Sequence, residues 1–465
     1  MRPVTSVARR LGPAAPVRSQ VPEVEPQIVR AKAKPGFVLG VIALGAMIVL
    51  ALWWHDTTSV HGFGEWLTGA GRILGLLCGY GVVVLVALMA RLPPLERGIG
   101  TDRLARWHAM GGRYVVSIVV AHALLVVWGY AVTAHANVVA ESGTLLTQYP
   151  DVLMATVAGF LLLGVGIVSM RAARRRMRYE TWYYLHFYTY LAIALAFSHQ
   201  FADGASFINS LAARFWWSAM YLTVALLVLW YRLAVPWRDF ARHRFRVAGV
   251  REEAPGVVSV YITGDRLAEL AADPGQFFRW RFLNRSLWWS SHPYSLSAAP
   301  GKDMLRITVK DLGDHSRALR MLRPGTRVWA EGPFGAFTAS SYASSRGAVL
   351  LAGGVGITPL RAMFAALPGR VTLIYRARSW HDIVFRDELD AIARARGARV
   401  HYVVGSRARL GADPLTAQVL LSMVPGLHKQ EVYVCGPAGM TQAAVTALLT
   451  AGVPRRRIHY ESFEF

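Results

Sequence analysis

Cysteine and charged residues are both scarce in this chain. Of 465 residues only Cys78 and Cys435 are cysteines, which excludes a disulfide scaffold and any zinc or iron–sulfur site built mainly from cysteine. Charged residues make up 17% of the chain and hydrophobic residues 54%, whereas ordinary soluble domains carry roughly 25% charged residues. The composition therefore predicts neither an entirely soluble enzyme nor a mostly disordered chain.

Acidic residues are also few, 28 against 51 lysines and arginines, and the formal net charge is +23. Such an excess is compatible with nucleic acid, an anionic membrane face or basic loops at one membrane surface. Residues 1–35 are rich in proline and arginine and lack helical periodicity, so they are expected to form a disordered basic tail. The apolar stretch that follows starts too late for a signal peptide.

Long apolar stretches are what the sequence has in abundance. Each is about 18–21 residues long, enough to cross the roughly 30 Å hydrocarbon core of a bilayer. They are Gly36–Trp54, Ile73–Ala90, Tyr114–Ala134, Val152–Met170, Trp182–Phe201 and Trp216–Leu233. Residues 36–236 are therefore predicted to form a bundle of six transmembrane helices.

Arginines alternate sharply between the connections of these six segments. Five lie in the connection Arg91–Arg113 and five between Arg171 and Arg178, whereas His55–Gly71 and His135–Asp151 contain none. The positive-inside rule then places both termini in the cytoplasm, as expected for a multi-pass protein of the cell membrane. Because so much of the positive charge lies in membrane-side loops, nucleic acid is not an expected partner.

Four histidines fall within two of the predicted spans. His108 and His122 belong to the third, and His186 and His199 to the fifth. The 14-residue spacing puts the first two roughly 40° apart on one helix face with about 21 Å of rise, whereas the 13-residue spacing puts the second two about 140° apart on an ideal helix. Two pairs stacked across a bilayer suit two bis-histidine haems; interhelical hydrogen bonding and a proton relay are the alternatives.

After residue 236 the pattern changes to that of two soluble domains. Short alternating runs between glycine and proline turns predict an antiparallel β-barrel in residues 237–340. Its strands are expected at Phe245–Val250, Val257–Thr263, Phe277–Phe282, Leu305–Lys310 and Arg327–Ala330. In residues 341–465 apolar strands at 348–352, 371–375, 400–404 and 432–435 alternate with helical stretches, which predicts a parallel α/β domain.

Two segments of the predicted barrel are candidates for binding a flavin. In His292-Pro-Tyr-Ser-Leu-Ser297, Tyr294 can stack on the flavin ring and the Ser295 hydroxyl can lie near its redox-active nitrogen. In Lys310-Asp-Leu-Gly-Asp-His-Ser316, a glycine followed by a hydroxyl residue can open a helix whose free N–H groups bind pyrophosphate.

Candidate nucleotide loops follow two strands of the α/β domain. Gly353-Gly-Val-Gly-Ile-Thr-Pro359 can bring its backbone close to a pyrophosphate at a helix N-terminus, and Cys435-Gly-Pro437 ends a later strand, where such sheets bind ligands. Arginine suits a ribose 2′-phosphate, which favours NADPH over NADH. The side chains proposed for it are Ser406, Arg407, Arg376 and Arg378.

Together these residues resemble the ferric reductase/NADPH oxidase superfamily, over about residues 37–465. The four histidines match its haem ligands by span and spacing, including the unequal 14 and 13. The remaining matches are His292, Pro293, Tyr294, Ser295 and Ser297 for the flavin; Lys310, Gly313, His315 and Ser316 for its pyrophosphate; and Gly353, Gly354, Gly356, Thr358, Pro359, Cys435, Gly436 and Pro437 for the nicotinamide nucleotide.

The resemblance implies two further roles and contains one departure. Phe465 corresponds to the terminal aromatic residue that covers the flavin, and Arg72 to the arginine near the outer haem. Where the oxidase branch has a further histidine, about one turn beyond the outer third-span ligand, this chain has Val126. The chain resembles the bacterial members called ferredoxin reductase-like or ferric reductase-like.

The resemblance implies a transmembrane oxidoreductase with FAD and two b-type haems. Cytoplasmic NADPH or NADH would supply electrons to an acceptor outside, either O₂, giving superoxide, or a ferric or cupric complex. The alternative is a non-enzymatic haem-binding or signalling membrane protein with a degenerate reductase module; its complete set of nucleotide loops argues against this.

Overall fold

The computed structural model describes residues 32–56, 60–174, 176–177, 179–202, 204, 207, 210–339, 347–405 and 414–462. The predicted basic tail lies almost wholly outside the described residues. The chain divides into a helical unit, Arg30–Trp237, and a second unit that contains Arg238–Phe465.

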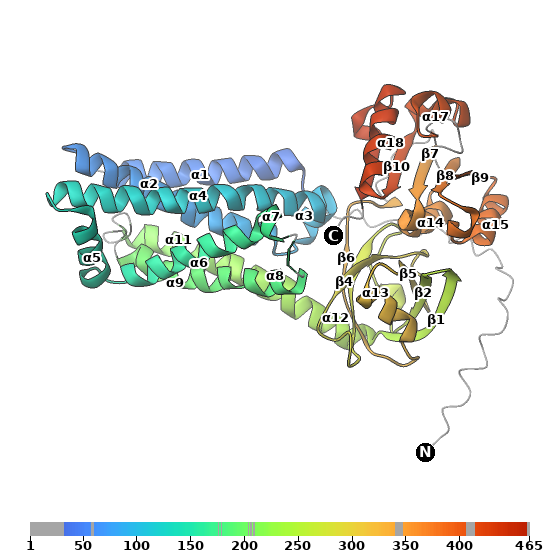
Figure 1. Ribbon diagram of the computed structural model, residues 1–465, viewed down its shortest axis with the longest axis horizontal. Helices are drawn as coiled ribbons and strands as arrows, with labels where there is room; N and C mark the ends of the chain where they lie inside the picture. The colour runs from blue at the N-terminus through green and yellow to red at the C-terminus, as the bar shows by residue number, and fades with distance from the viewer. Residues whose placement is uncertain are drawn as a thin grey trace, which may run out of the picture. The chain divides into compact units, whose positions relative to one another are not determined.

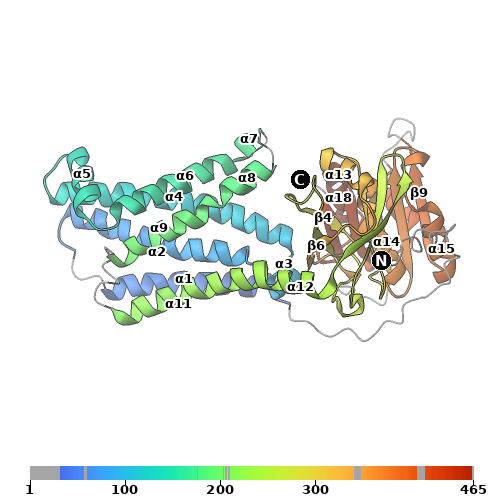
Figure 2. The ribbon, with the colours of Figure 1, turned by 90° about the horizontal axis from the view of Figure 1, so that it is seen from below.

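The helical unit contains long apolar helices that run alongside one another in both views (Figures 1 and 2). Five helices are long and apolar enough to cross a membrane among the residues described. The elements are α1 (Pro35–Asp56), α2 (Phe63–Leu88), α3 (Pro93–Ile99), α4 (Thr101–Thr133), α5 (Val138–Gln148), α6 (Val152–Ser169), α7 (Arg171–Arg174), α8 (Tyr179–His186), α9 (Tyr188–Ala202), α11 (Leu211–Leu229), the π-helix η2 (Trp230–Ala234) and α12 (Val235–His243).

The predicted fifth span is not one helix, so six uninterrupted spans are not confirmed. Helix α8 ends at His186 and α9 begins at Tyr188. At the break the Phe187 amide donates to the Tyr184 carbonyl and the Tyr190 amide to the Phe187 carbonyl. These i→i+3 bonds make a 3₁₀-like turn, which has three residues per turn. The 140° angle between His186 and His199 therefore does not apply, because it assumes a continuous α-helix.

Helix α4 begins thirteen residues before the predicted third span. Much of the connection predicted at Arg91–Arg113 is therefore helical, and that part of the prediction was wrong. Arginine is a good helix former, so the helix continues past the end of the apolar stretch. As a result, His108 and His122 share one continuous helix.

Small residues let α2 and α4 approach closely. A Cβ added at Gly64 would lie 2.4 Å from Thr133 Oγ1, one at Gly71 would lie 2.6 Å from Val126 Cγ2, and one at Gly75 would lie 2.9 Å from His122 Cε1. Packing through small residues is typical of membrane helices, which lack a hydrophobic driving force for association.

The first lobe of the second unit is built from two three-stranded antiparallel sheets. One has the order β1 (Arg246–Ala254), β2 (Val257–Thr263), β5 (Leu305–Lys310), and the other β4 (His292–Ser295), β3 (Phe277–Phe282), β6 (Val328–Phe334). All five predicted strands are present. Among the residues described, the isolated bridges Arg246–Arg327 and Leu296–Ile307 link the two sheets, and a closed barrel is not confirmed.

The second lobe is the predicted parallel α/β domain. Its strands β7 (Ala348–Gly353), β8 (Val371–Ala377), β9 (Arg399–Val404), β10 (Glu431–Gly436) and β11 (Ile458–Ser462) have the order β11-β10-β7-β8-β9. Helices α14 (Ile357–Ala366) and α15 (Arg386–Arg396) pack on one face, and α17 (Ala417–Met423) and α18 (Ala438–Thr450) on the other. Strand order reverses between β7 and β10, where such sheets bind nucleotides.

An Arg–Glu–Arg cluster, with Arg306 buried and its two partners half-buried, joins the two lobes. Arg306 on β5 donates to both carboxylate oxygens of Glu388 on α15, at 2.7 and 3.0 Å, and Arg361 on α14 donates to the same carboxylate at 2.9 Å. Burial opposes ionisation of Glu388, but these hydrogen bonds and charges outweigh it and hold its pKa below the ordinary value. The carboxylate therefore stays charged between its two arginines.

We expect Glu388→Gln to destabilise this unit by about 3 kcal/mol, because it leaves one buried and one half-buried guanidinium group without a counter-charge. The native pKa lies below the unfolded one, so the stabilisation is complete at neutral pH and is lost as the pH falls through the native value. Urea unfolding at several pH values measures both effects. The exposed Glu252–Arg320 pair supplies the control, since Glu252→Gln should change stability by less than about 1 kcal/mol. Equal effects of the two variants at neutral pH would contradict this account.

Candidate functional site

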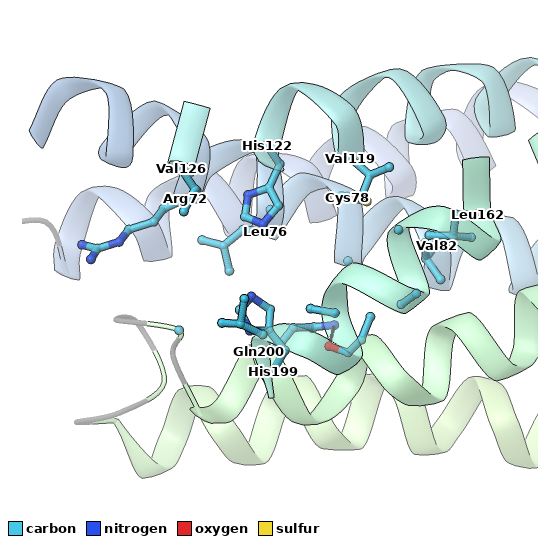
Figure 3. A pocket seen from close by; sticks show the side chains of 18 of the residues that line it. Arg72, Leu76, Cys78, Val82, Val119, His122, Val126, Leu162, His199 and Gln200 are labelled. Atoms are coloured by element: carbon cyan, nitrogen blue, oxygen red, sulfur yellow. Dashed lines mark hydrogen bonds between the residues drawn. The ribbon is translucent and has the colours of Figure 1, made fainter. Parts of the chain in front are cut away.

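A cavity in the helical unit is enclosed by α2, α4, α6, α9 and α11. His122 of α4 and His199 of α9 point toward one another across it, and Arg72 lies near one end (Figure 3). Most of the remaining lining is apolar, including Leu76, Val119 and Val126. The cavity is thus an apolar slot with an imidazole on either side.

Both histidines of α4 are held by backbone carbonyls of α2. Nδ1 of His108 donates to the Leu85 carbonyl at 3.0 Å, and Nδ1 of His122 to the Gly71 carbonyl at 2.8 Å. A carbonyl can only accept, so each Nδ1 carries the proton and each Nε2 keeps a free lone pair. Metal-ligating histidines are oriented in this way by a hydrogen bond from the other ring nitrogen.

The second pair of histidines is His108 on α4 and His186 at the end of α8. Their ring centroids are 5.9 Å apart. Metal–imidazole bonds are about 2.0 Å, so two imidazoles on opposite sides of one metal ion have centroids about 6 Å apart. Nδ1 of His186 is buried and has no hydrogen-bond partner among the described residues. The four predicted histidines thus form two pairs, each with one ring from α4.

These two pairs fit bis-imidazole ligation of haem. The α4 rings present unprotonated nitrogens, His108 and His186 have the right separation, and the slot between His122 and His199 is apolar. Gly79 and Trp217 both line this cavity, and the lack of a side chain at Gly79 lets Trp217 pack closely on α2. A flat macrocycle between two axial histidines needs these features.

A polar cluster beside His199 was not predicted from the sequence. Gln200 accepts a hydrogen bond from Trp217 Nε1 at 2.6 Å and donates to the Tyr221 hydroxyl at 3.4 Å, and Tyr221 donates to the Gly79 carbonyl at 3.2 Å. The cluster ties α9, α11 and α2 together next to the histidine. Only the position of Gln200 directly after His199 pointed to it.

The predicted flavin motif lies on β4 and meets the start of α13 (Asp314–Ala318). Tyr294 Oη and His315 Nδ1 are 3.2 Å apart, and the rings of His292 and His315 have centroids 3.7 Å apart. Burial, followed by the neighbouring His292, lowers the pKa of His315 to about 3. Its buried Nε2 has no partner among the described residues, so a neutral ring offers an unused polar atom at this site.

The two serines of the motif have different surroundings. Ser295 is buried at the end of β4. Ser297 is fully buried, and its hydroxyl accepts hydrogen bonds from Thr308 Oγ1 at 2.7 Å and Arg306 Nε at 3.2 Å. Ser297 therefore supports the Arg306–Glu388 link between the lobes, and its hydroxyl is occupied by protein groups.

The predicted pyrophosphate loop forms a tight turn before α13. Ser316 Oγ accepts from the Leu312 amide at 2.8 Å and donates to the Gly313 carbonyl at 2.8 Å. Lys310, at the end of β5, is exposed. The serine hydroxyl thus shapes the loop, while the lysine faces solvent.

The two predicted nucleotide loops lie against each other at the reversal of strand order. A Cβ added at Gly356 would lie 2.1 Å from the Cys435 carbonyl oxygen, and one at Gly436 3.2 Å from Gly353 Cα. Gly354 has a φ of +54°, a conformation that glycine adopts readily. Thr358 and Pro359 are buried at the start of α14. Only glycine permits this close approach, which brings both loops to the carboxyl ends of β7 and β10.

Cys435 is wholly buried in the core of the α/β lobe. Burial raises the pKa of its thiol well above the ordinary value, and the nearby Glu461 acts in the same direction. The thiol is therefore protonated at neutral pH. Glu461, which the sequence reasoning missed, also lies 3.5 Å from the Cβ position of Gly335 in the first lobe.

Two of the four residues proposed for the 2′-phosphate, Arg376 and Arg378, lie in the described part of the chain. Arg376 donates to the Ala377 and Val403 carbonyls, so part of its guanidinium is committed to the backbone. Arg378 is exposed. Ser406, Arg407 and Phe465 lie outside the described residues.

Comparison with known proteins agrees with this layout. The family model "Ferric reductase like transmembrane component" matches residues 74–197, "FAD-binding domain" matches 255–338 and "Oxidoreductase NAD-binding domain" matches 350–446. The first of these ranges contains three of the four histidines and ends two residues before His199.

Curated relatives match a little under half of the chain. The ferredoxin reductase component of 3-ketosteroid-9-alpha-monooxygenase from Mycolicibacterium smegmatis is 32% identical over 47% of this chain and 65% of its own length. Ferredoxin–NADP reductase B from Sorangium cellulosum is 30% identical over 37% of this chain and 77% of its own. The chain thus spans slightly less than two thirds of the first relative.

Among solved structures, the FAD/NAD-binding domain of nitric oxide dioxygenase from Vibrio cholerae is 25% identical. It aligns with 48% of this chain and 99% of its own, with a TM-score of 0.39.

An apolar helical region followed by FAD- and NAD-binding modules defines a multi-pass membrane oxidoreductase of the flavoprotein class. The chain belongs to the ferric reductase/NADPH oxidase superfamily, whose architecture these three matches make up in order. The resemblance inferred from the sequence is thereby confirmed.

We expect Gly356→Ala to slow flavin reduction by NAD(P)H by roughly a hundredfold, since displacing a binding loop by about 1 Å can have an effect of that size. The added methyl group would meet the backbone of Cys435, which cannot rotate away. Stopped-flow flavin absorbance measures the rate, and FAD content shows whether the first lobe is intact. Gly439→Ala is the control, because a Cβ there meets nothing within 4 Å. A wild-type rate in Gly356→Ala would contradict the assignment of this loop.

Proposed function

We propose that the protein carries electrons across the cell membrane, from NAD(P)H through FAD and two haems to an acceptor on the outer side. The observation that carries the proposal is the arrangement of four histidines as two facing pairs, with both α4 rings fixed by carbonyls of α2. A chain that joins this arrangement to flavin and nicotinamide modules has a source of electrons and a route for them.

The arginines support a cytoplasmic location for the His108–His186 end. Arg91, Arg103 and Arg106 precede or accompany His108, and the arginines of α7 precede His186. By the positive-inside rule this end, and with it both termini, faces the cytoplasm. Moving one electron outward across about 100 mV, inside negative, then releases about 2.3 kcal/mol.

The proposed function assigns a cofactor to each group of residues. His108 and His186 would hold the inner haem, and His122 and His199 the outer one. Tyr294, His315 and the loop at Gly313 would bind FAD, and the loops at Gly353–Pro359 and Cys435–Pro437 NAD(P)H. When bound, flavin takes a hydride and haem takes single electrons, so together they convert a two-electron donor to one-electron transfer.

The first test is anaerobic reduction of the haems by nicotinamide nucleotides. Membranes that contain the protein should show the spectrum of reduced b-type haem after addition of NADPH or NADH. The nucleotide that gives the higher rate of haem reduction is the expected physiological donor. Admission of air, with and without a ferric or cupric chelate, then identifies the acceptor by which one reoxidises the haems. Absence of haem, or haem that neither nucleotide reduces, would overturn the proposal and favour a non-enzymatic membrane protein.

We expect His199→Leu to halve the haem content and to leave flavin reduction by NAD(P)H at the wild-type rate, because only the outer pair loses a ligand. Pyridine haemochrome analysis and stopped-flow absorbance measure the two quantities. His55→Leu, at an exposed position near the end of α1, is the matched control and should retain both haems. Full haem content in His199→Leu would show that the ligand assignment is incorrect.

A further inference from the structure

Arg232 is the one charged residue in the last apolar segment, 216–233. It lies on the π-helix η2, where the Val235 amide donates to the Trp230 carbonyl in an i→i+5 bond. Ionisable residues in membrane helices mark functional sites by default, and π-turns occur frequently at such sites because they redirect side chains. The position of Arg232 therefore indicates a functional role for its charge.

Arg232 and His108 bind the same face of α2. Arg232 Nε donates to the Met89 carbonyl at 2.9 Å, and His108 Nδ1 donates to the Leu85 carbonyl at 3.0 Å. Residues four apart are neighbours on a helix surface, separated by a rise of about 6 Å. The guanidinium thus lies beside the inner histidine pair, toward the arginine-rich end of the unit.

The terminal nitrogens of Arg232 make no hydrogen bond to any residue that the structure describes, and the side chain is only partly exposed. The nearby Glu96 carboxylate is hydrogen-bonded by Thr101 and forms no ion pair within 4 Å with Arg232 in the described part of the chain. The guanidinium of Arg174 lies 4.4 Å over the ring of Trp182, which is itself next to His186. Arg232, by contrast, has terminal donors that no described residue occupies.

We propose that Arg232 binds a propionate carboxylate of the inner haem through these free terminal nitrogens. The inference rests on the proposed function, since it requires a haem between His108 and His186. Haem b carries two carboxylates at one edge, and guanidinium is the group best suited to bind a carboxylate with two parallel hydrogen bonds. The bond to Met89 fixes the arginine in place beforehand, so little side-chain freedom is lost on binding.

The proposal predicts a change in the redox properties of one haem only. A positive charge beside a haem stabilises its reduced form, so Arg232→Gln should shift the midpoint potential of the inner haem to a more negative value. In a redox titration each haem gives one reduction step. The haem that remains in His199→Leu shows which step belongs to the inner haem. Loss of a charge-assisted hydrogen bond should also weaken retention of the inner haem roughly tenfold. Glutamine keeps an N–H donor for the Met89 carbonyl, so the packing of η2 on α2 is preserved.

Two further variants separate charge from structure. Arg232→Lys keeps the charge and should hold the inner potential close to the wild-type value while still weakening haem retention. Arg106→Gln removes a charge two residues from His108, from an exposed part of α4, and should leave both potentials unchanged. Size-exclusion chromatography and the rate of flavin reduction confirm that each variant is folded.

The possible outcomes are distinguishable. If the unaltered protein contains no haem, the proposed function itself is wrong. If it shows two reduction steps and Arg232→Gln moves neither, or if Arg106→Gln moves the inner step equally, the role of Arg232 is overturned while electron transfer stands. If Arg232→Gln yields only misfolded protein but Arg232→Lys has wild-type haem retention, Arg232 serves to cap α2 and the proposal fails.

Discussion

The helical unit depends on two hydrogen bonds, from Nδ1 of His108 and of His122 to carbonyls of α2. Leu85 and Gly71, the acceptors, are 14 residues apart on α2, just as the two histidines are 14 apart on α4. Antiparallel helices therefore repeat the same contact twice, about 21 Å apart. The bonds require a close approach of α2 and α4, which explains why Gly75 lies where His122 packs. They also direct both Nε2 atoms away from α2, toward α8 and α9.

The positions of His108 and His122 on α4 explain why the chain breaks between α8 and α9. His186 and His199 must face rings that are 14 residues of α-helix apart, yet they are separated by only 13. A 3₁₀ turn rises about 2.0 Å per residue against 1.5 Å for an α-helix, so about three such residues lengthen the 13-residue segment to about 21 Å. The i→i+3 bonds at Phe187 and Tyr190 supply such a turn, directly after the inner histidine. The unequal spacing therefore becomes compatible with two pairs at matched heights.

Local signals predicted the second unit more completely than the helical one. Alternating or continuous apolar runs such as Phe277–Phe282 and Ala348–Ala352 located strands closely, because burial on one or both sheet faces determines their composition. The glycine loops could be predicted because close backbone approach needs glycine. The start of α4, the break at Phe187 and the bridging of two sheets at Leu296–Ile307 could not. They depend on where individual backbone hydrogen bonds form or are lost, which the period of the apolar residues does not encode. Arg232 had a signal, as the one charge in an apolar segment, but its partners became apparent only with the fold.

Several arginines of this chain donate hydrogen bonds within the fold, in addition to those expected in loops at the membrane surface. The chain has 28 acidic residues for 51 basic ones, and several half-buried arginines bind backbone carbonyls instead of carboxylates. Arg376 binds those of Ala377 and Val403, Arg396 those of Phe364 and Leu367, and Arg232 that of Met89. A planar guanidinium can donate to a carbonyl and still keep donors for a second group, which a lysine ammonium does less well. Glu388 is the contrasting case, where one carboxylate serves Arg306 and Arg361 and so ties the flavin lobe to the nucleotide lobe. Lysine is rare in this chain, with five residues. Substitution of these arginines by lysine would preserve the net charge but would remove the hydrogen bonds that hold α14, β8 and η2 in place.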